Sequence, residues 1–203
     1  MKEREEMDRR KADFHARSER YARLGFDRFA AAEFVIGAGG RLSGPALDVG
    51  TGKGLTAMAL ARRGLDVVSV DPDAEEQALA LLLADEAGLA GRIRFACGDA
   101  SDLPFPGGHF GCAALVGVLH HLGDPVPVLG ETARVLKPGG IAILADFSPE
   151  GLEIVARVHR EDGREHPVTG ATPESAAALL STRGFAVEAR LSGHNHDVVV
   201  LVK

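Results

Sequence analysis

One short stretch, residues 46–54, constrains the fold of this chain more than any other. It reads ALDVGTGKG, an apolar run followed by glycine at every second position. Glycine has no Cβ, so such a turn lets the backbone approach a ligand closely and directs N–H groups toward it. A second apolar run, 67–70, ends at Asp71. A strand, a glycine turn, a helix and a second strand that ends in a carboxylate form half of a nucleotide-binding crevice.

The spacing of the glycines distinguishes between nucleotide cofactors. A dinucleotide fingerprint is G-x-G-x-x-G, which seats a pyrophosphate on a helix N-terminus. Here Gly50, Gly52 and Gly54 stand closer together, and Asp48 precedes them. A carboxylate repels a pyrophosphate but can hold an ammonium group, while Asp71 is placed to accept hydrogen bonds from a ribose. The loop therefore favours S-adenosylmethionine, which has an amino acid head, a ribose and an adenine but no phosphate, over NAD.

Apolar periodicity predicts helices between the strands. Helical spacing with glycine stops predicts one helix over about 53–63 and a second that begins at Asp73, where Asp73 and Glu76 form a capping box. A third helix carries an apolar stripe that includes Leu136 and ends before Pro138. These helices are spaced as crossover connections between parallel strands.

Short apolar runs predict the remaining strands. A helix that begins at Thr172, with a proline in its first turn, precedes the last two apolar runs, 185–191 and 197–202. A short loop joins these two runs as a hairpin. Alternating strands and helices predict an α/β fold, a doubly wound and mainly parallel sheet with an antiparallel strand supplied by the C-terminal hairpin. The predicted strands lie at 93–97, 112–118, 141–147, 185–191 and 197–202.

Further motifs follow in order along the chain: GDASDLPF at 98–105, LHHL at 119–122 and RVLKPGG at 134–140. Together with ALDVGTGKG and VVSVDPD, the chain from Ala46 to Phe147 resembles the class I S-adenosylmethionine-dependent methyltransferases, in the branch of the ubiquinone and menaquinone C-methyltransferases. The resemblance implies a Rossmann-like sheet of seven strands and transfer of a methyl group to a small-molecule acceptor. A non-catalytic protein that binds S-adenosylmethionine as a regulatory or scaffold subunit is the alternative.

The resemblance also implies a role for each cofactor-binding residue. The backbone at Gly50 and Gly52 is expected to face the methionyl part of S-adenosylmethionine, with Asp48 toward its ammonium, and Asp71 is expected to accept from the ribose hydroxyls. Asp99 matches the position that accepts from the adenine amine. Lys53 is expected to be a solvated residue of a first helical turn. The full expected set is Tyr21, Asp48, Gly50, Thr51, Gly52, Gly54, Asp71, Pro72, Asp99, Ala100, Gly117 and Val118.

Length and composition predict one domain over residues 1–203, since 203 residues with 45% apolar content suffice for one substantial core. The expected parts are an N-terminal helical cover, a cofactor-binding core and an acceptor-side segment with the terminal hairpin. Tyr21, the single tyrosine, lies in the cover, where its hydroxyl could reach the cofactor. The helical cover spans residues 1–37, the cofactor-binding core spans 46–147, and the acceptor-side segment with the hairpin spans 148–203.

Histidines supply the candidate catalytic groups. Methyl transfer from a sulfonium needs alignment and exclusion of water, and a base only when the acceptor must lose a proton. His120 and His121 follow the predicted strand 112–118, so one of them is the candidate base, and a packing role is the alternative. His159 and His166 are candidates for lining the acceptor pocket. The remaining pair in the hairpin loop, His194 and His196, is interpreted as surface residues.

Several function classes are disfavoured by composition and by missing motifs. The net charge of −6 argues against a nucleic-acid surface, and no apolar run is long enough to span a bilayer. Cys97 and Cys112 lie in apolar runs and fit no zinc spacing, so no metal site is expected. Both are expected to be small buried hydrophobes, and free thiols indicate a reducing cytoplasm. Gly111 replaces an aspartate that is frequent in the family and is expected to weaken a sheet-edge contact. The identity of the acceptor and the formation of a homodimer are left open.

Overall fold

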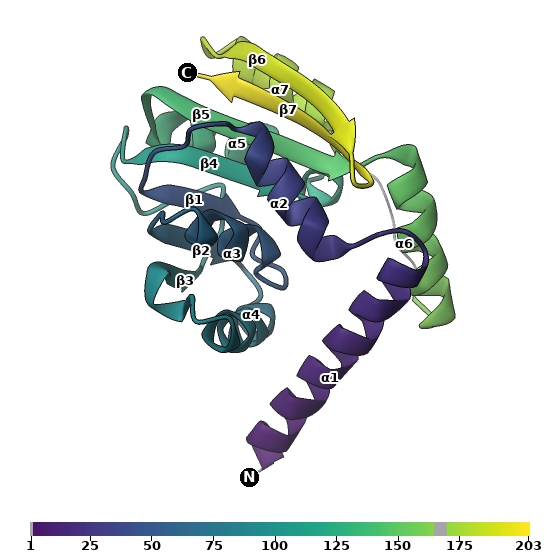
Figure 1. Ribbon diagram of the computed structural model, residues 1–203. Coiled ribbons are helices and arrows are strands. Elements are labelled where there is room, and N and C mark those ends of the chain that lie inside the picture. The colour runs from purple at the N-terminus through teal and green to yellow at the C-terminus, as the bar shows by residue number, and fades with distance from the viewer. Residues whose placement is uncertain (1, 165–169) are drawn as a thin grey trace.

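The computed structural model describes residues 2–164 and 170–203, and within them seven strands form one sheet (Figure 1). The strand order is β3-β2-β1-β4-β5-β7-β6. Strands β1 to β5 are parallel, and β7 runs antiparallel to both β5 and β6. This confirms the predicted doubly wound sheet. The bounds are β1 Ala46–Val49, β2 Val67–Asp71, β3 Ile93–Cys97, β4 Phe110–Val116, β5 Leu136–Phe147, β6 Ala186–Gly193 and β7 His196–Val202.

Helices cover both faces of the sheet (Figure 1). Side chains of α2, α3 and α4 pack on one face, and side chains of α5 and α7 pack on the other. With helices on both faces, the central strand β1 is buried along its whole length and shows no polar alternation. The helices are α1 Lys2–Arg23, α2 Arg28–Ala38, α3 Leu55–Arg62, α4 Ala74–Glu86, η1 Ala90–Arg92, η2 Leu119–His121, α5 Val126–Val135, α6 Pro149–Glu161 and α7 Pro173–Ser181.

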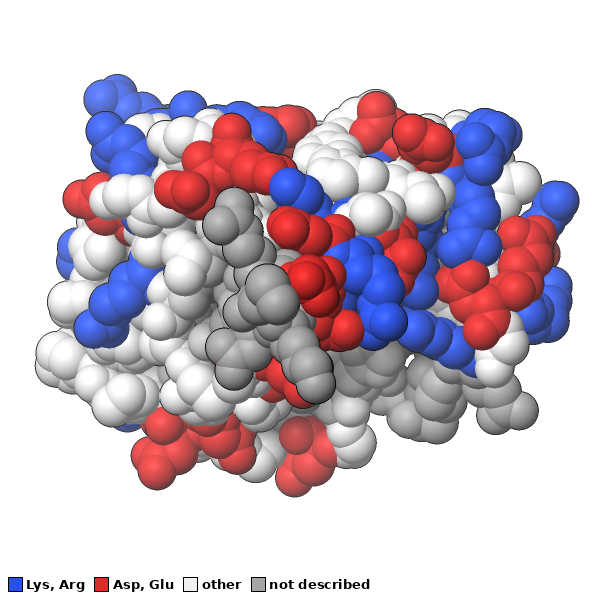
Figure 2. Space-filling view, turned by 90° about the horizontal axis from the view of Figure 1, so that it is seen from below, with Lys and Arg blue, Asp and Glu red and all other residues white. Residues whose placement is uncertain are grey.

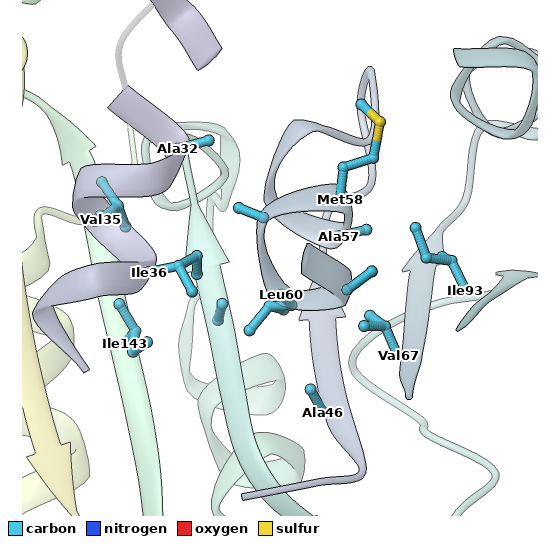
Figure 3. Packing of buried hydrophobic residues seen from close by; sticks show 14 of the residues in the cluster. Ala32, Val35, Ile36, Ala46, Ala57, Met58, Leu60, Val67, Ile93 and Ile143 are labelled. Atoms are coloured by element: carbon cyan, nitrogen blue, oxygen red, sulfur yellow. The ribbon is translucent and has the colours of Figure 1, made fainter. Parts of the chain in front are cut away.

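The core beneath α2 and α3 holds the first strands in register. Ile36 of α2 and Leu60 of α3 are fully buried and lie between the two helices and the sheet (Figure 3). They pack in one cluster with Ile143 of β5 and Val67 of β2. Burial of such a side chain contributes about 1.5–3 kcal/mol. This packing fixes the loop after β1, which joins β1 to α3.

Helix caps follow the sequence signals, with one difference at α4. Asp73 caps α4 by accepting from the backbone N–H groups of Glu75 and Glu76 at 2.9 and 3.1 Å. The Glu76 carboxylate does not complete the predicted capping box and instead pairs with Lys53 and with Arg10. The box forms fully at α7, where Thr172 caps through Ser175.

The start of β5 differs from the prediction. Leu136, expected on the preceding helix, is the first residue of β5 and lies opposite Phe110 of β4. The register shifts between Phe110 and Cys112, which accommodates Pro138 in a strand despite its missing N–H. Leu136 is fully buried, and a buried apolar residue fits the end of a helix as well as the start of a strand. Its apolar character therefore did not distinguish the two.

Gly111 is a packing requirement rather than a weakened contact. A Cβ at this position would lie 2.3 Å from the carbonyl oxygen of Ser43, and the Gly111 N–H donates to the Pro45 carbonyl at 2.9 Å. No side chain fits between β4 and this segment. The expectation of a weakened sheet-edge contact was therefore wrong.

The N-terminal helix α1 is a polar helix that packs on α4 and α6 through ion pairs. Arg10 pairs with Glu75, and both Arg17 and Arg20 pair with Asp162. On the face seen in Figure 2, Lys and Arg side chains interleave with Asp and Glu rather than forming one large basic patch. Exposed ion pairs contribute only about 0–1 kcal/mol each. The main anchors of α1 are therefore its buried aromatic side chains, Phe14 and Tyr21.

In the described part of the chain, no helix has the length and apolarity needed to cross a bilayer.

Candidate functional site

The carboxyl ends of β1 and β4 form the crevice of the sheet. Chain order reverses at this pair, because β1 pairs with β2 on one side and with β4 on the other. Ligands of open α/β sheets bind at such a point. Gly50 follows β1 with φ +83°, and a Cβ there would lie 2.9 Å from Cγ2 of Val118. Gly52 has φ +46°, and nothing lies within 4 Å of where its Cβ would be. The loop is therefore closely packed at Gly50 and open at Gly52.

A cavity of about 190 Å³ lies against this loop. Of the expected cofactor residues, Gly50, Thr51, Gly52 and Gly117 line it, whereas Gly54 is buried at the N-cap of α3, where an added Cβ would lie 3.0 Å from Cβ of Ala80 in α4. The cavity also has an aromatic wall. Its remaining lining residues are Phe26, Arg28, Ala32, Lys53, Leu55, Thr56, Val116, Phe147 and His196.

Asp48 lies beneath the loop in a buried hydrogen-bond chain. Its Oδ2 accepts from Ser69 Oγ at 2.7 Å, and Ser69 Oγ lies 2.6 Å from Thr51 Oγ1. Asp48 Oδ1 is buried and has no hydrogen-bond partner within the described chain. Burial raises the pKa of the Asp48 carboxyl to about 7. The hydrogen bond from Ser69 opposes this rise in pKa, and the nearby negative charge of Asp71 adds to it. The structure thus places a poorly solvated carboxyl directly behind the glycine loop.

Asp71 holds the glycine loop from the end of β2. Its Oδ2 accepts from the Gly52 N–H at 3.1 Å, and its Oδ1 accepts from the Asp73 N–H at 2.8 Å. Pro72, the next residue, is exposed, and its carbonyl accepts from the thiol of Cys97. Cys97 is itself exposed, which corrects the expectation that both cysteines are buried; Cys112 is buried. The end of β2 therefore presents a carboxylate next to the most open part of the loop.

Asp99 occupies the turn after β3. Its side chain is exposed and its Oδ1 accepts from the Ser101 N–H at 2.8 Å, and this hydrogen bond holds the pKa of Asp99 below its usual range. Ala100 is half-buried against the core. The turn lies at the same sheet edge as Asp71, because Asp71 pairs with Cys97 at the end of β3.

The two adjacent histidines after β4 have different environments. His120 is buried, with its Nδ1 2.7 Å from Oδ1 of Asp146, and its backbone N–H donates to Asp146 Oδ2 at 3.0 Å. His121 is exposed, and its ring centroid lies 3.9 Å from that of His120. Burial, followed by the neighbouring His120, lowers the pKa of His121. Of the two, His121 lines a cavity, while His120 is held by Asp146.

A second, larger cavity of about 490 Å³ lies beneath α1. The cofactor candidate Tyr21, the catalytic candidate His121 and the acceptor-pocket candidate His159 all line this second cavity, and Tyr21 does not line the loop cavity; His166 lies outside the described residues. Arg28 and Lys53 line both cavities, so the two spaces adjoin. Lys53 was expected to be solvated, but its ammonium pairs with Glu76 at the cavity wall. The other lining residues are Arg10, Asp13, Phe14, Arg17, Glu76, Leu79 and Arg164.

His196 corrects the interpretation of the hairpin histidines as surface residues. It is 5% exposed and packs against the rings of Phe26 and Phe147, at centroid distances of 5.6 and 5.1 Å. Because β7 is antiparallel to β5, its first residue pairs with the last residue of β5, Phe147, at the carboxyl edge of the sheet. Burial lowers the pKa of His196. Only His194 of the pair is exposed.

Some residues of the site carried a weak sequence signal or none. Asp146 ends the apolar run of β5 as Asp71 ends that of β2, and this similarity could have identified it. Arg28 begins α2 in a charged N-terminal region, where its position at the site has no local signature. Phe147 and His196 meet through pairing of distant strands.

Comparisons with known proteins identify the family and the fold. A family model described as a methyltransferase domain matches residues 47–144. A demethylmenaquinone methyltransferase of Thermus thermophilus is 31% identical over 170 residues, which cover 71% of this chain and 76% of that protein. A 27-O-demethylrifamycin SV methyltransferase of Amycolatopsis mediterranei is 37% identical over 123 residues, 58% of this chain and 45% of that protein. The match thus spans less than half of this second relative, and the same holds for an uncharacterized methyltransferase of Bacillus subtilis, YcgJ, of which it covers 41%.

Solved structures share the fold. A structure described as a SAM dependent methyltransferase from Aquifex aeolicus superposes with a TM-score of 0.69 at 20% identity, covering 95% of this chain and 97% of that one. The [4+2]-cyclase SpnF also superposes with a TM-score of 0.69, at 21% identity, covering 86% and 80%. The predicted seven-stranded Rossmann-like fold and the predicted resemblance are both confirmed. The chain belongs to the class I S-adenosylmethionine-dependent methyltransferases, and S-adenosylmethionine is its cofactor.

Proposed function

We propose that this protein transfers a methyl group from S-adenosylmethionine to a small-molecule acceptor bound in the cavity beneath α1. The observation that carries the proposal is the pair of adjoining cavities, which share Arg28 and Lys53. One contains the glycine loop and Gly117, and the other contains His121. A methyltransferase needs a cofactor site and an acceptor site in direct contact, because the acceptor must approach the methyl group in line.

The residues at the loop fit the cofactor. The space beside Gly52 can take the methionyl part, the unpartnered Oδ1 of Asp48 is suited to its ammonium, and Asp71 is suited to the ribose hydroxyls. Asp99 and Ala100 would meet the adenine. The remaining members of the proposed cofactor set are Tyr21, Gly50, Thr51, Gly54, Pro72, Gly117 and Val118. When bound, S-adenosylmethionine supplies a methyl group on a positively charged sulfur that leaves readily.

The protein's own contribution is then alignment and exclusion of water. Phe26, Phe147 and His196 form an aromatic wall at the end of β4, next to Gly117. Helix α1 covers the second cavity and is held by its contacts with α4 and α6. Enclosing the reacting groups removes competing water and keeps the acceptor in line with the methyl group.

His121 is the proposed general base for acceptors that must lose a proton. Its lowered pKa keeps the imidazole neutral near pH 7, so a ring nitrogen can accept the acceptor's proton. The hydrogen bonds between Asp146 and His120 fix the turn that carries His121. In this scheme His120 is a positioning residue. His159 would line the acceptor pocket on the opposite side, from α6.

The alternative function is binding of S-adenosylmethionine without methyl transfer. The [4+2]-cyclase SpnF has this fold at similar overlap, and a shared fold does not determine the reaction. Methyl transfer is favoured here because two relatives named for methylation of a demethylated quinone or antibiotic match at 31% and 37% identity.

One experiment separates the two functions. Purified protein is incubated with S-adenosylmethionine labelled in its methyl group and with a metabolite extract, and the small molecules are then separated. Label in a new small molecule supports methyl transfer, and the His121→Gln variant serves as the comparison. Binding of S-adenosylhomocysteine by calorimetry without any transfer of label supports the scaffold function.

We also propose that the protein works in the reducing cytoplasm and does not bind nucleic acid. Both Cys97 and Cys112 are free thiols, as is usual in a reducing compartment. The net charge of −6 and the mixed charges of the face in Figure 2 support an uncharged or small ligand over a polyanion.

A further inference from the structure

The cofactor carries a carboxylate beside its ammonium, and the proposed cofactor set contains no cationic side chain to bind it. S-Adenosylmethionine, whose role here rests on the family assignment, is a zwitterion at its amino acid end. Asp48 and Asp71 both carry negative charge when ionised and would repel a carboxylate. A cation at the wall of the loop cavity would complement this carboxylate, and the cavity is lined by two, Arg28 and Lys53.

Arg28 is the one of these two that no carboxylate neutralises. Lys53 is paired with Glu76. The guanidinium of Arg28 lies over the rings of Phe14 and Tyr21, at 5.2 and 5.3 Å from their centroids. Its side chain makes one long hydrogen bond, from Nη1 to Ser18 Oγ at 3.4 Å. Within the described residues, no Asp or Glu oxygen lies within ion-pair distance of it.

Other cations near the second cavity are already paired or exposed. Arg10 pairs with Glu75 and Arg17 pairs with Asp162. Arg164 is exposed and lines the second cavity but not the loop cavity. Arg28 therefore differs from its neighbours in lining both spaces while lacking an anionic partner.

A half-buried guanidinium without an anion leaves strong donors unused. Arginine carries five N–H donors and stays charged at all ordinary pH values. Removing such a charge from water is unfavourable unless a counter-charge and hydrogen bonds replace the water. Burial accordingly lowers the pKa of Arg28 from its ordinary value. A ligand carboxylate would supply both the charge and the acceptors, in the bidentate geometry that a guanidinium favours.

We propose that Arg28 binds the methionyl carboxylate of S-adenosylmethionine. Arg28 shares its cavity with Gly52, where the loop is open, and with Gly117 at the end of β4. Phe14 and Tyr21 belong to α1 and hold the guanidinium by cation–π contacts, so α1 acts on the cofactor site through Arg28. Because Arg28 also lines the second cavity, the competing occupant is a carboxylate of the acceptor.

The test compares two ligands that differ only in the carboxylate. S-Adenosylhomocysteine carries it, and S-adenosyl-3-thiopropylamine, the decarboxylated compound, does not. Dissociation constants are measured by calorimetry for the wild type, Arg28→Gln, Arg28→Lys and the control Arg20→Gln. Arg20 is a half-buried arginine of α1 that lines neither cavity.

The wild type should prefer S-adenosylhomocysteine by at least about 10-fold, as expected for a charge-assisted contact of this kind. Arg28→Gln should abolish the preference by weakening that ligand alone, Arg28→Lys should retain part of it, and Arg20→Gln should keep it in full. An equal preference for S-adenosylhomocysteine in the wild type and in Arg28→Gln overturns the proposal. Loss of binding of both ligands in Arg28→Gln also overturns it, because that result indicates a structural role for Arg28. The wild-type preference tests the proposal even where a variant does not fold. A wild type that binds neither compound refutes the cofactor assignment itself.

Discussion

Replacement of Asp48 by asparagine should change how stability depends on pH. Asp48 is completely buried beneath the glycine loop, with one oxygen hydrogen-bonded to Ser69 and the other without a partner in the part of the chain that the structure describes. Burial raises its pKa from 3.8 to about 7, so the folded protein binds the carboxyl proton more tightly than the unfolded chain does. The stability that this proton provides is complete below about pH 4 and is lost as pH rises to about 7.

The size of the effect follows from the two pKa values. A change from 3.8 to about 7 corresponds to about 4 kcal/mol in total, and about 3 kcal/mol of it falls between about pH 5 and pH 8. Asparagine keeps the shape and can still accept from Ser69, but it does not ionise. The Asp48→Asn variant should therefore gain about 3 kcal/mol relative to the wild type over this pH range, a large fraction of the stability of an ordinary domain.

Urea denaturation followed by circular dichroism at several pH values measures the difference directly. The control is Asp66→Asn, because the Asp66 side chain is 82% exposed and should show no such pH dependence relative to the wild type. A difference between Asp48→Asn and the wild type that stays constant over the whole pH range would show that Asp48 ionises normally, and the argument about its burial would be refuted.

Three further outcomes are expected. Asp71→Ala should weaken binding of S-adenosylhomocysteine by about 10- to 100-fold in calorimetry, since it removes both the proposed ribose acceptor and the support of Gly52; unchanged affinity would contradict the cofactor site. In the wild type, methyl transfer to an acceptor that loses a proton should rise with pH through a pKa below 6.5 and level off, and His121→Gln should lower the rate and remove this step. Gly111→Ala should lower the free energy of unfolding by about 1–3 kcal/mol in urea titrations, because its Cβ would overlap the Ser43 carbonyl; an unchanged midpoint would show that the 41–45 segment moves aside.

The order of strands and helices could be predicted because its signals are local. The glycine turn after β1, the cap at Asp73 and the cap at Thr172 each act within four residues, and each is formed in the structure. Leu136 shows the limit of such signals. An apolar residue at the junction of α5 and β5 satisfies both patterns, and only pairing with Phe110 places it in the strand.

The walls of the site could not be predicted because they arise from pairing between distant elements. His196 follows a tight turn and has the local features of a surface residue, yet antiparallel pairing with Phe147 buries it. His120 and Asp146 meet because β4 and β5 are neighbours, and nothing near His120 in the sequence indicates its partner. Arg28 depends on the docking of α1, whose contacts with the remainder of the chain include long-range ion pairs and two aromatic side chains.

Two groups in the site have unmet interactions of opposite sign, and this constrains what can bind there. Among the described residues, Asp48 has a buried oxygen without a hydrogen bond, and Arg28 has a guanidinium without an anion. Thr51 connects them in space, since it lines the cavity with Arg28 and reaches Asp48 through Ser69. A ligand with a single charge would satisfy one group and leave the other desolvated. A zwitterionic amino acid satisfies both, and its ammonium would favour ionised Asp48, so binding near neutral pH should release protons. The charges of Asp48 and Arg28 thus favour an amino acid head over a phosphate, independently of the glycine spacing.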